Sequence, residues 1–569
     1  MASSAIGEAH ALQRPGDARL AWLAFVCGLL FAALTLSGDY VLGGGAYWTL
    51  PFGDAAKGEI GWFYYARDTW QLPLFATSAY HTPEGSSMVL SDSLPLFALP
   101  AKLIYRLAWP AGSTPPIYTG LWVALCLVLQ AVAASRVLRV LGVADWRVHL
   151  AGIVLFCYLP IVFLRFGQAA LMGQFVILFA LEGYLRAKRM GLTRRQWIWL
   201  CALPPLVLLI HPYLSAMCGA LVAATILDQW RDRRHGVAGV LLRFGGIGVG
   251  ALVVMLVGGF FAAASSDFGD YGLYSMNLLS PWVPFPQTSS GSLLHTEMPV
   301  IEGTNQWEGG AYLGAGVFLL CVVALPALRN WRRNLHRHAV LFVVLILVLA
   351  FAISHRIGFG SHELMRLPLP DALLHVLSQF RGSGRFVWVA VYALLAALIV
   401  AVVRRYDGRR VLLILGVAAV LQVVDAWPMQ RGVRAASAAS QTVSSVDLSA
   451  WTRLIGEHQR IFEFPSFECG GLFGREIAGS KFRELEFDWI AAQQNKPTNS
   501  AYLARFTKDC TRERLDALAH HDEPGVLYLY RSSDDIGAYL LQGGVDLARC
   551  GYLDDVVVCS GGGDLSTLR

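Results

Sequence analysis

The chain has 569 residues, of which 55% are hydrophobic and 15% are charged, and its formal net charge is +6. A soluble protein of this size carries about a quarter charged residues, so this composition excludes an ordinary soluble enzyme. The basic residues gather in short loops between apolar runs, so the positive charge is not a nucleic-acid signal, and we expect no nucleic-acid partner.

Repeated apolar runs of about 18 residues predict a polytopic membrane protein. Residues 1–19 are mostly polar and form the predicted N-terminus, and the run from Leu20 to Leu36 is long enough to be an uncleaved anchor. We expect an all-α membrane domain of about eleven transmembrane helices within residues 20–427. The predicted spans lie at about 20–36, 117–135, 148–166, 169–186, 197–212, 214–229, 240–262, 311–328, 338–354, 386–403 and 410–427.

Every second connection between these spans is basic. The positive-inside rule places such connections, and the N-terminus with them, in the cytoplasm. The segments 263–310 and 355–385 and the tail from 428 then lie outside, as in a bacterial inner-membrane protein with a periplasmic C-terminal domain. The basic connections contain Arg136, Arg139, Arg147, Arg186, Lys188, Arg189, Arg194, Arg195, Arg231, Arg233, Arg234, Arg329, Arg332, Arg333, Arg337, Arg404, Arg405, Arg409 and Arg410.

Residues 94–109 decide the number of spans. They are apolar enough for a twelfth span, but counting them as one would place all those arginines outside. The segment is short and contains two prolines together with Lys102 and Arg106. We predict an amphipathic helix in the outer membrane interface, with a twelfth span as the alternative. One continuous periplasmic loop then covers residues 37–116.

This first outer loop is long, aromatic and rich in carboxylates, and loops on a rigid scaffold often hold the chemistry of a protein. Asp54, in FGDAAKGEIGWFYYARDTW, is the first candidate. Its carboxylate can accept a proton from an acceptor hydroxyl, or hold Mg²⁺ or Mn²⁺ beside a phosphate leaving group. Asp39, just after the first span, is the second candidate, at a position suited to a lipid-linked substrate. The alternative for each is an ordinary loop carboxylate.

Two further residues of the loop are candidate substrate ligands. Asp92 precedes the helix predicted at 94–109, and the alternative is that one of Ser91, Asp92 and Ser93 caps that helix. Arg67 can pair with phosphate oxygens through two parallel hydrogen bonds, or it can cap a helix or pair with Asp68.

The later outer segments carry the remaining candidates. Arg381 and Arg385 flank a Gly-Ser-Gly turn, an arrangement that suits a diphosphate, and we expect this turn to face the first-loop carboxylate across the site. Glu308, in TNQWEGGAYLGAG, can line a sugar pocket at the mouth of a span. His211 and Arg165 lie near outer helix ends, where ionisable groups are usually functional or paired, unless they extend to the interface.

Residues 428–450 are predicted to be a linker and residues 451–569 a small α/β domain. Strands are expected at RIFEFPS and GVLYLYRS, and helices at TRERLDALAHH and SDDIGAYLLQ. Four cysteines in a domain placed outside the cytoplasm predict disulfides, with three connectivities left open. A zinc site is the alternative, although no CxxC or CxxH spacing supports it. The cysteines are Cys469, Cys510, Cys550 and Cys559.

Several blocks of the chain look like those of a known type of protein: GDAAKGEIGWFYYARDTW, SDSLPLFALPAK, RFGQAALMGQFVIL, HPYL, EGGAYLGAGVF and FRGSGRFVWVAVYALL. Most of residues 20–430 resembles a bacterial family of membrane proteins whose function is not established and which is similar to the GT-C superfamily of polyprenyl-phosphate-sugar glycosyltransferases. The resemblance implies that a first-loop aspartate is catalytic base or metal ligand, with Asp54 the best match and Asp39 second. No Asp-Glu or Asp-x-Asp doublet occurs at Asp54, so metal dependence stays open.

The resemblance also implies a polyprenyl-phosphate-sugar donor. We therefore expect an enzyme that transfers a hexose or pentose to an envelope glycan, lipid or protein acceptor while surrounded by membrane lipids. The alternatives are a transporter or flippase of lipid-linked glycans and a noncatalytic envelope-assembly protein that acts through its tail. The middles of the spans carry almost no charge and the polar residues gather on one face, which favours the enzyme over the transporter.

Overall fold

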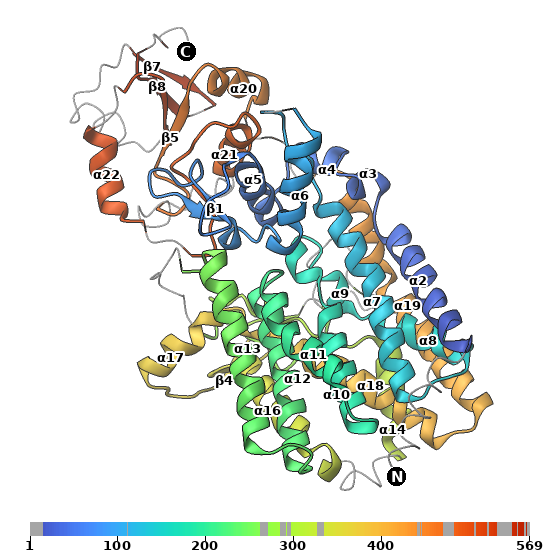
Figure 1. Cartoon of the computed structure of the whole chain (residues 1–569). Helices are drawn as coiled ribbons and strands as arrows, with labels where there is room; N and C mark the ends of the chain where they lie inside the picture. The colour runs from blue at the N-terminus through green and yellow to red at the C-terminus, as the bar shows by residue number, and fades with distance from the viewer. Residues whose placement is uncertain are drawn as a thin grey trace. The chain divides into compact units, whose positions relative to one another are not determined.

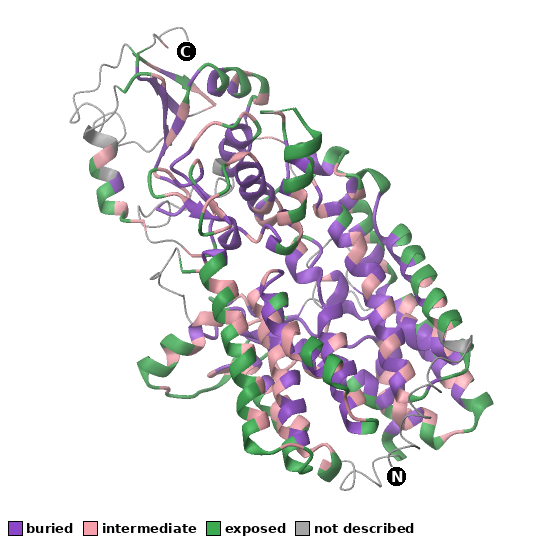
Figure 2. Ribbon diagram, viewed as in Figure 1, coloured by how far each residue is buried: buried purple, intermediate pink, exposed green. Residues whose placement is uncertain are grey.

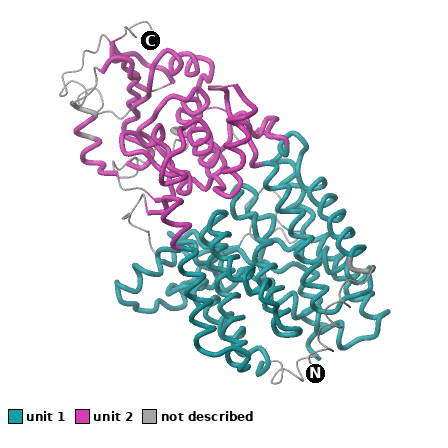
Figure 3. The backbone as a smooth tube through the Cα atoms, viewed as in Figure 1, with its two compact units in different colours: residues 1–41, 120–251, 268–438 teal, residues 42–119, 252–267, 439–569 magenta. Residues whose placement is uncertain are grey.

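The computed structural model describes residues 15–110, 112–261, 271–284, 292, 298–326, 335–440, 444, 446–469, 483–505, 508–519, 523–531, 549–554, 556–562 and 565. The chain forms two compact units (Figure 3). Unit 1 consists of Met1–Val41, Gly120–Ala251 and Phe268–Ala438, and unit 2 of Leu42–Thr119, Leu252–Asp267 and Ala439–Arg569. Most of the first outer loop therefore folds with the tail.

Helices occupy every segment that the sequence predicts as a span (Figure 1). Short breaks divide some of them, as between α8 and α9, where Pro160 opens the second piece. The helices are α2 (Pro15–Thr35), α7 (Thr119–Leu141), α8 (Trp146–Cys157), α9 (Pro160–Phe163), η2 (Ala169–Met172), α10 (Phe175–Arg189), α11 (Arg194–Leu208), α12 (Pro212–Arg231), α13 (Val237–Gly258), α14 (Ala315–Ala324), α16 (Ala339–Ile353), α18 (Val387–Arg405) and α19 (Gly408–Ala438).

Among the described residues, six helical stretches are long and apolar enough to cross a membrane: α2, α7, α13 and α19, together with Ala169–Arg189 and Ser383–Arg405. Their outward faces carry exposed apolar side chains, such as Leu242 of α13, which is 78% exposed (Figure 2). Apolar surface on this scale belongs in lipid rather than in water, and the chain is a membrane protein. The count of about eleven spans and their orientation stay predictions.

Polar side chains join the helices of unit 1 in its interior. Tyr392 of α18 donates a hydrogen bond to Gln174 (2.8 Å) and accepts one from Gln130 of α7 (2.9 Å). Gln422 of α19 donates to the carbonyl of Leu313 (3.1 Å), before α14. Such contacts between helices fix their pairing where apolar packing alone is not specific.

Short elements of unit 1 lie in the segments predicted to be outside the membrane. Strand β3 (Arg356–Phe359) pairs antiparallel with β4 (His362–Arg366). Helix α17 (Asp371–Leu377) and the 3₁₀ turns η5 (Ser378–Phe380) and η6 (Ser383–Phe386) then lead into α18, and η3 (Gln306–Gly309) precedes α14. The short helix α3 (Gly38–Val41) follows α2. These elements position the arginine-rich site described below.

In unit 2, the first loop supplies α4 (Ala46–Thr49), α5 (Gly53–Arg67), β1 (Ala76–Thr77), β2 (Ser86–Ser87), η1 (Met88–Leu90) and α6 (Pro95–Ala108). Helix α6 matches the segment predicted to be amphipathic. It buries Ala98 and Tyr105 and exposes Leu103 and Leu107. Its N-cap is Leu94, with no side-chain cap, so the alternative that Asp92 or a neighbouring serine caps this helix is wrong.

The tail forms a four-stranded sheet in the order β5-β6-β8-β7. Strand β5 (Arg460–Phe464) runs parallel to β6 (Val526–Arg531), while β8 (Val556–Ser560) is antiparallel to both β6 and β7 (Cys550–Leu553). Alternate residues of β6 enter two cores, Leu527 and Leu529 on one face and Tyr528 and Tyr530 on the other. This period of two is the signature of a strand covered on both faces.

The helices of the tail are α20 (Leu448–Gly456), α21 (Arg483–Gln493) and α22 (Cys510–Ala519). The predicted strands and the helix at TRERLDALAHH are confirmed, and the helix predicted at SDDIGAYLLQ lies outside the described residues. Helix α19 continues through Pro428 to Ala438, so the predicted linker 428–450 is helical in its first part. Disulfides join Cys469 to Cys510 and Cys550 to Cys559, which settles the open connectivity.

Candidate active site

Asp54 lies in the first turn of α5, directly after Gly53, whose φ of +56° is in the left-handed region. A carboxylate in the first turn is favoured because it faces the positive end of the helix dipole. Lys57 follows three residues later and therefore on the same face of α5. Asp54 is partly exposed and Lys57 is buried.

The Lys57 side chain ends between charged and aromatic partners. Its Nζ lies 2.6 Å from Oδ2 of Asp92 and 4.9 Å from the ring centroid of Tyr502. Burial alone lowers the pKa of Lys57, but the carboxylates of Asp92 and Asp54 outweigh burial and hold the pKa above its usual value. The amine is therefore an ammonium ion. We refer to Asp54, Lys57, Asp92 and Tyr502 as the Lys57 site.

Asp92 lies in the segment Ser91–Ser93, and the packing of this segment against α5 holds Asp92 in place. A Cβ on Gly61 would be 2.0 Å from Oγ of Ser91, so only glycine permits this approach. The hydroxyl of Ser93 donates to the carbonyl of Gly58 (2.7 Å). Asp92 has a φ of +57°, a left-handed conformation that aspartate tolerates better than most residues. The strained backbone and the close packing together direct its carboxylate to Lys57.

Tyr502 comes from the tail. Its backbone N–H donates to the hydroxyl of Tyr80 (3.1 Å), and its ring lies 4.5 Å from the ring of Phe467. Helix α21 also contacts the first loop, since the ring of Trp489 lies 5.2 Å from that of Phe63 on α5. The tail therefore contributes a side chain to this site, whereas sequence reasoning named candidates only in the first loop and in the membrane domain.

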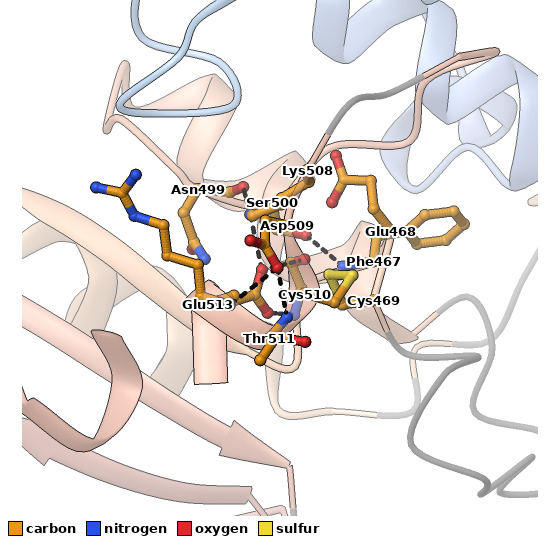
Figure 4. The surroundings of a disulfide bond; sticks show 12 residues. Phe467, Glu468, Cys469, Asn499, Ser500, Lys508, Asp509, Cys510, Thr511 and Glu513 are labelled. Carbon is orange, nitrogen blue, oxygen red and sulfur yellow. Dashed lines mark hydrogen bonds and ion pairs between the residues drawn. A yellow bond between two sulfur atoms is a disulfide. The ribbon is translucent and has the colours of Figure 1, made fainter. Parts of the chain in front are cut away.

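A buried polar network positions the backbone before Tyr502 (Figure 4). Lys508 lies 2.9 Å from Oε2 of Glu513 and donates to the carbonyl of Asn499 (2.6 Å). The Cys469–Cys510 disulfide lies beside this network (Figure 4). Ser466, just after β5, donates two hydrogen bonds to Glu513 of α22 (2.6 and 2.7 Å), and the disulfide joins Cys469 to Cys510. The chain after β5 is therefore linked to the start of α22, and Lys508 connects this region to the backbone of Asn499.

Glu468 extends the same network toward the first loop. Its Oε2 accepts a hydrogen bond from the N–H of Ala501 (3.2 Å), and its Oε1 lies 3.4 Å from Nε2 of His81. Burial raises the pKa of the Glu468 carboxyl to about 7, in spite of the lowering effect of Lys508. No local pattern predicts this network, because its members are far apart in the chain.

Arg67, predicted as a phosphate ligand, serves the packing of unit 2. Its Nε donates to the carbonyl of Ser113 (3.1 Å), and its two terminal nitrogens donate to the carbonyls of Ala492 and Gln493. These carbonyls are at the C-terminal end of α21, where a helix has no partners of its own for them. The alternative of helix capping is therefore the one observed.

A second cluster forms in unit 1 around Glu308, which lies in η3. Both Nε and Nη2 of Arg385 donate to its Oε2 (2.9 and 2.8 Å), and Nη1 of Arg165 donates to the same oxygen (2.6 Å). Burial raises the pKa of Glu308, but the two guanidinium groups outweigh it and hold the pKa at about 2. We call Arg165, Glu308, Arg381 and Arg385 the arginine cluster.

The turn between Arg381 and Arg385 packs closely on the turn that carries Glu308. A Cβ on Gly384 would lie 2.6 Å from Cα of Gly309 and 2.9 Å from the nitrogen of Met276. Because Gly309 and Gly384 have no Cβ, the backbone that follows Glu308 and the backbone of the Arg381–Arg385 turn can approach this closely. Arg381 is exposed, with its guanidinium 5.7 Å from the ring centroid of Tyr274.

His211, predicted to bind substrate, is the N-cap of α12. Its Nδ1 accepts the N–H of Tyr213 (3.2 Å). The Tyr213 hydroxyl accepts the N–H of Gly382 (2.9 Å), and the guanidinium of Arg385 lies 5.1 Å from its ring centroid. His211 therefore supports the arginine cluster through Tyr213.

Asp39 lies exposed in α3 of unit 1. The neighbouring Ser37 donates to the carbonyl of Ser437 at the end of α19 (2.6 Å). On its other side, the ring of Tyr40 lies 5.1 Å from that of Phe166, the residue after Arg165 in the chain. Asp39 and the arginine cluster belong to unit 1 and Asp54 to unit 2, so the predicted pairing of the Arg381–Arg385 turn with Asp54 stays a prediction.

The candidates Asp54 and Asp92 thus lie in the Lys57 site, and Glu308, Arg381 and Arg385 lie in the arginine cluster, whereas sequence reasoning did not name Lys57 or Tyr502. The spacing Asp54-x-x-Lys57 was a signal for Lys57, because residues three apart share a helix face. Nothing near Tyr502 in the sequence links it to the first loop.

Comparison with curated proteins finds no match. Among solved structures, a crystal structure of the Archaeoglobus fulgidus oligosaccharyltransferase tethered to an acceptor peptide is 12% identical, with a TM-score of 0.44 over 95% of this chain and 73% of that one. The archaeal oligosaccharyltransferase AglB from the same organism, in complex with an inhibitory peptide and a dolichol-phosphate, is 13% identical, with a TM-score of 0.43 over 93% and 72%.

A family profile described as a domain of unknown function, DUF6311, matches residues 25–427. A second profile, described as the DUF6311 C-terminal domain, matches residues 450–561. The two matches confirm the prediction of a membrane-protein family whose function is not established. Since the first match covers most of the chain, this protein belongs to the DUF6311 family.

Proposed function

We propose that this protein is a membrane glycosyltransferase that transfers a sugar from a polyprenyl-phosphate-linked donor to an acceptor of the cell envelope. The reaction takes place on the periplasmic face of a bacterial inner membrane. The observation that carries the proposal is the Lys57 site, in which a buried ammonium lies against the carboxylate of Asp92 and beside an aromatic ring, with Asp54 near enough to raise its pKa. Aspartate is among the side chains that act as a general base toward a hydroxyl group.

Asp54 has the features of a general base. It is partly exposed, so that an acceptor hydroxyl can reach it, and it lies on a helix rather than on a flexible tip. In the proposed reaction Asp54 takes the hydroxyl proton while the hydroxyl oxygen attacks the anomeric carbon of the donor. The bond between that carbon and the phosphate oxygen breaks, and the lipid phosphate leaves with the electron pair.

The arginine cluster supports a phosphorylated donor. Its three guanidinium groups and one carboxylate leave two formal positive charges among these side chains. Glu308 is shared by Arg165 and Arg385, and Arg381 is exposed beside them. Guanidinium groups recognise phosphate oxygens through charge-assisted hydrogen bonds, and we assign Arg381 and Arg385 to the phosphate of the donor.

The test is a comparison of Asp54→Asn with Glu84→Gln in cells that lack the wild-type protein. Glu84 is an exposed carboxylate of the same loop and serves as the matched control. Loss of a general base reduces a rate by about 10²–10⁴-fold. We expect Asp54→Asn to lose the envelope glycan modification at unchanged protein level, whereas Glu84→Gln keeps it. Full modification with Asp54→Asn would refute the assignment.

A further inference from the structure

The resemblance to GT-C enzymes implies a first-loop aspartate that is either a catalytic base or a metal ligand, and the described residues bear on the second of these roles. Mg²⁺ and Mn²⁺ are bound by oxygen ligands in a nearly octahedral arrangement, usually with one or two carboxylates. Within the part of the chain that the structure describes, no three side chains of His, Cys, Asp or Glu are grouped to hold a metal ion. The carboxylates nearest to such a role are Asp54 and Asp92.

A side-chain cation already lies against Asp92 and within electrostatic reach of Asp54. The ammonium of Lys57 is 2.6 Å from Oδ2 of Asp92, and the carboxylates of Asp92 and Asp54 both stabilise its positive charge. A metal ion bound to the same oxygens would meet this positive charge in a water-poor environment, where like charges repel strongly. The carboxylate oxygens of Asp54 and Asp92 therefore do not form a site that fits a divalent cation.

The ammonium is also fixed in position. The Lys57 side chain is 4% exposed, and the ring of Tyr502 lies against its charged end, an arrangement that favours a cation. The segment Ser91–Ser93 is locked onto α5 through Gly61 and through the Ser93–Gly58 hydrogen bond. For a metal ion to bind here, Lys57 would have to leave its buried position beside Asp92. Its ammonium would then lose its partner, which is unfavourable in free energy.

We infer that the Lys57 ammonium takes the place of a divalent cation at this site, so that the Asp54 and Asp92 carboxylates act without a bound metal. The inference rests on the proposed function in treating these carboxylates as the active site. Lys57 is a positioning residue: it neutralises Asp92 and provides the fixed positive charge beside Asp54. Tyr502 makes this arrangement depend on the tail as well as on the first loop.

The direct test is Mn²⁺ binding to the purified full-length protein in detergent, measured by electron paramagnetic resonance. Wild-type protein, Asp54→Asn and Asp92→Asn should take up the same amount of Mn²⁺, because none of them holds the ion at this site. Uptake by unrelated surface groups, which survives both substitutions, agrees with the inference. An equivalent of Mn²⁺ that is bound by the wild type and lost in either variant would overturn it.

A second experiment removes the positive charge of the Lys57 side chain. Lys57→Met keeps an unbranched side chain but removes its charge. We expect this variant to bind Mn²⁺ at least tenfold more tightly than the wild type. The double variant Lys57→Met/Asp92→Asn should lose this gain in affinity. Lys57→Arg retains the charge and should show no gain. A folded Lys57→Met protein without increased affinity would contradict the inference. Neither arm measures sugar transfer, so these results are independent of the glycan test of the proposed function.

Discussion

The Nζ atom of Lys57 lies 2.6 Å from Oδ2 of Asp92, a residue 35 positions later in the chain. This contact joins the start of α5 to the segment that precedes α6. Both groups are charged, and Lys57 has lost nearly all contact with solvent. The Asp92 side chain is 31% exposed, so Lys57 is the buried member of the pair and is left with an uncompensated charge if Asp92 is displaced.

The packing of Ser91–Ser93 on α5 predicts opposite effects for two neighbouring glycines. A Cβ on Gly61 would meet Oγ of Ser91 at 2.0 Å, whereas a Cβ on Gly58 would have its nearest contacts at 3.9 Å. Gly61→Ala should therefore displace Asp92 from Lys57 and reduce glycan modification at least tenfold. Gly58→Ala should keep the activity and raise stability by up to about 1 kcal/mol, the helix preference of alanine over glycine. Equal activity of the two variants would contradict this account.

Glu308 is the shared partner of Arg165 and Arg385, so its removal leaves two guanidinium groups without their carboxylate. Glu308→Gln should lower the stability of the folded protein by about 3–5 kcal/mol, the usual cost of breaking a buried ion pair. Thermal unfolding of the full-length protein in detergent measures the effect. Glu302→Gln, an exposed position of the same segment, is the control and should leave the unfolding temperature unchanged.

Glu468 predicts a pH-dependent stability. Burial raises the pKa of this carboxyl from 4.5 to about 7, so between these values the folded chain keeps a proton that the unfolded chain has lost. The folded state then binds more protons, and its stability falls as the pH rises through this window. Glu468→Gln cannot lose a proton, and its unfolding temperature relative to wild type should rise from pH 5 to pH 8.

The control for this measurement is Glu457→Gln, an exposed position of the same domain. Its difference from wild type should be constant over the same range of pH. If the difference between Glu468→Gln and wild type is also constant, the Glu468 carboxyl is not protonated in the folded protein near neutral pH.

The two disulfides should differ in their contribution to stability. The Cys469–Cys510 bridge closes a chain segment with a sequence separation of 41, and the Cys550–Cys559 bridge one of 9. Loop-closure entropy then gives about 4 kcal/mol for the first bridge and about 3 kcal/mol for the second. Replacing the cysteines of each pair by serine and measuring thermal unfolding compares the two. A larger loss from the shorter bridge would contradict the entropic estimate.

The helices of the membrane domain could be predicted from the sequence because each is a long apolar run, and such runs are recognised without knowledge of their neighbours. The helix α6 was predicted in the same local way. Hairpin β7–β8 was missed, although the run Val556–Cys559 is typical of a buried strand. Its pairing with β6 depends on residues far away in the chain.

The site could be predicted only in part. Arg67 was interpreted as a phosphate ligand, but its partners are carbonyls of Ala492 and Gln493 in the tail, which no local pattern indicates. Glu308 was interpreted as part of a sugar pocket, whereas it forms ion pairs with two arginines from separate segments. In each case the role of the side chain is decided by contacts between distant parts of the chain.

The most direct test of the proposed sugar transfer compares cells with and without this protein. Both the envelope glycans and the lipid-linked sugars of these cells are measured. If this protein transfers a sugar, we expect one sugar to be missing from an envelope glycan, lipid or protein when the protein is absent, and a polyprenyl-phosphate-linked sugar to accumulate. Re-expression of the wild type, but not of Asp54→Asn, should reverse both changes. Identical glycans and identical lipid-linked sugars in the two kinds of cell would contradict the claim that this protein transfers a sugar.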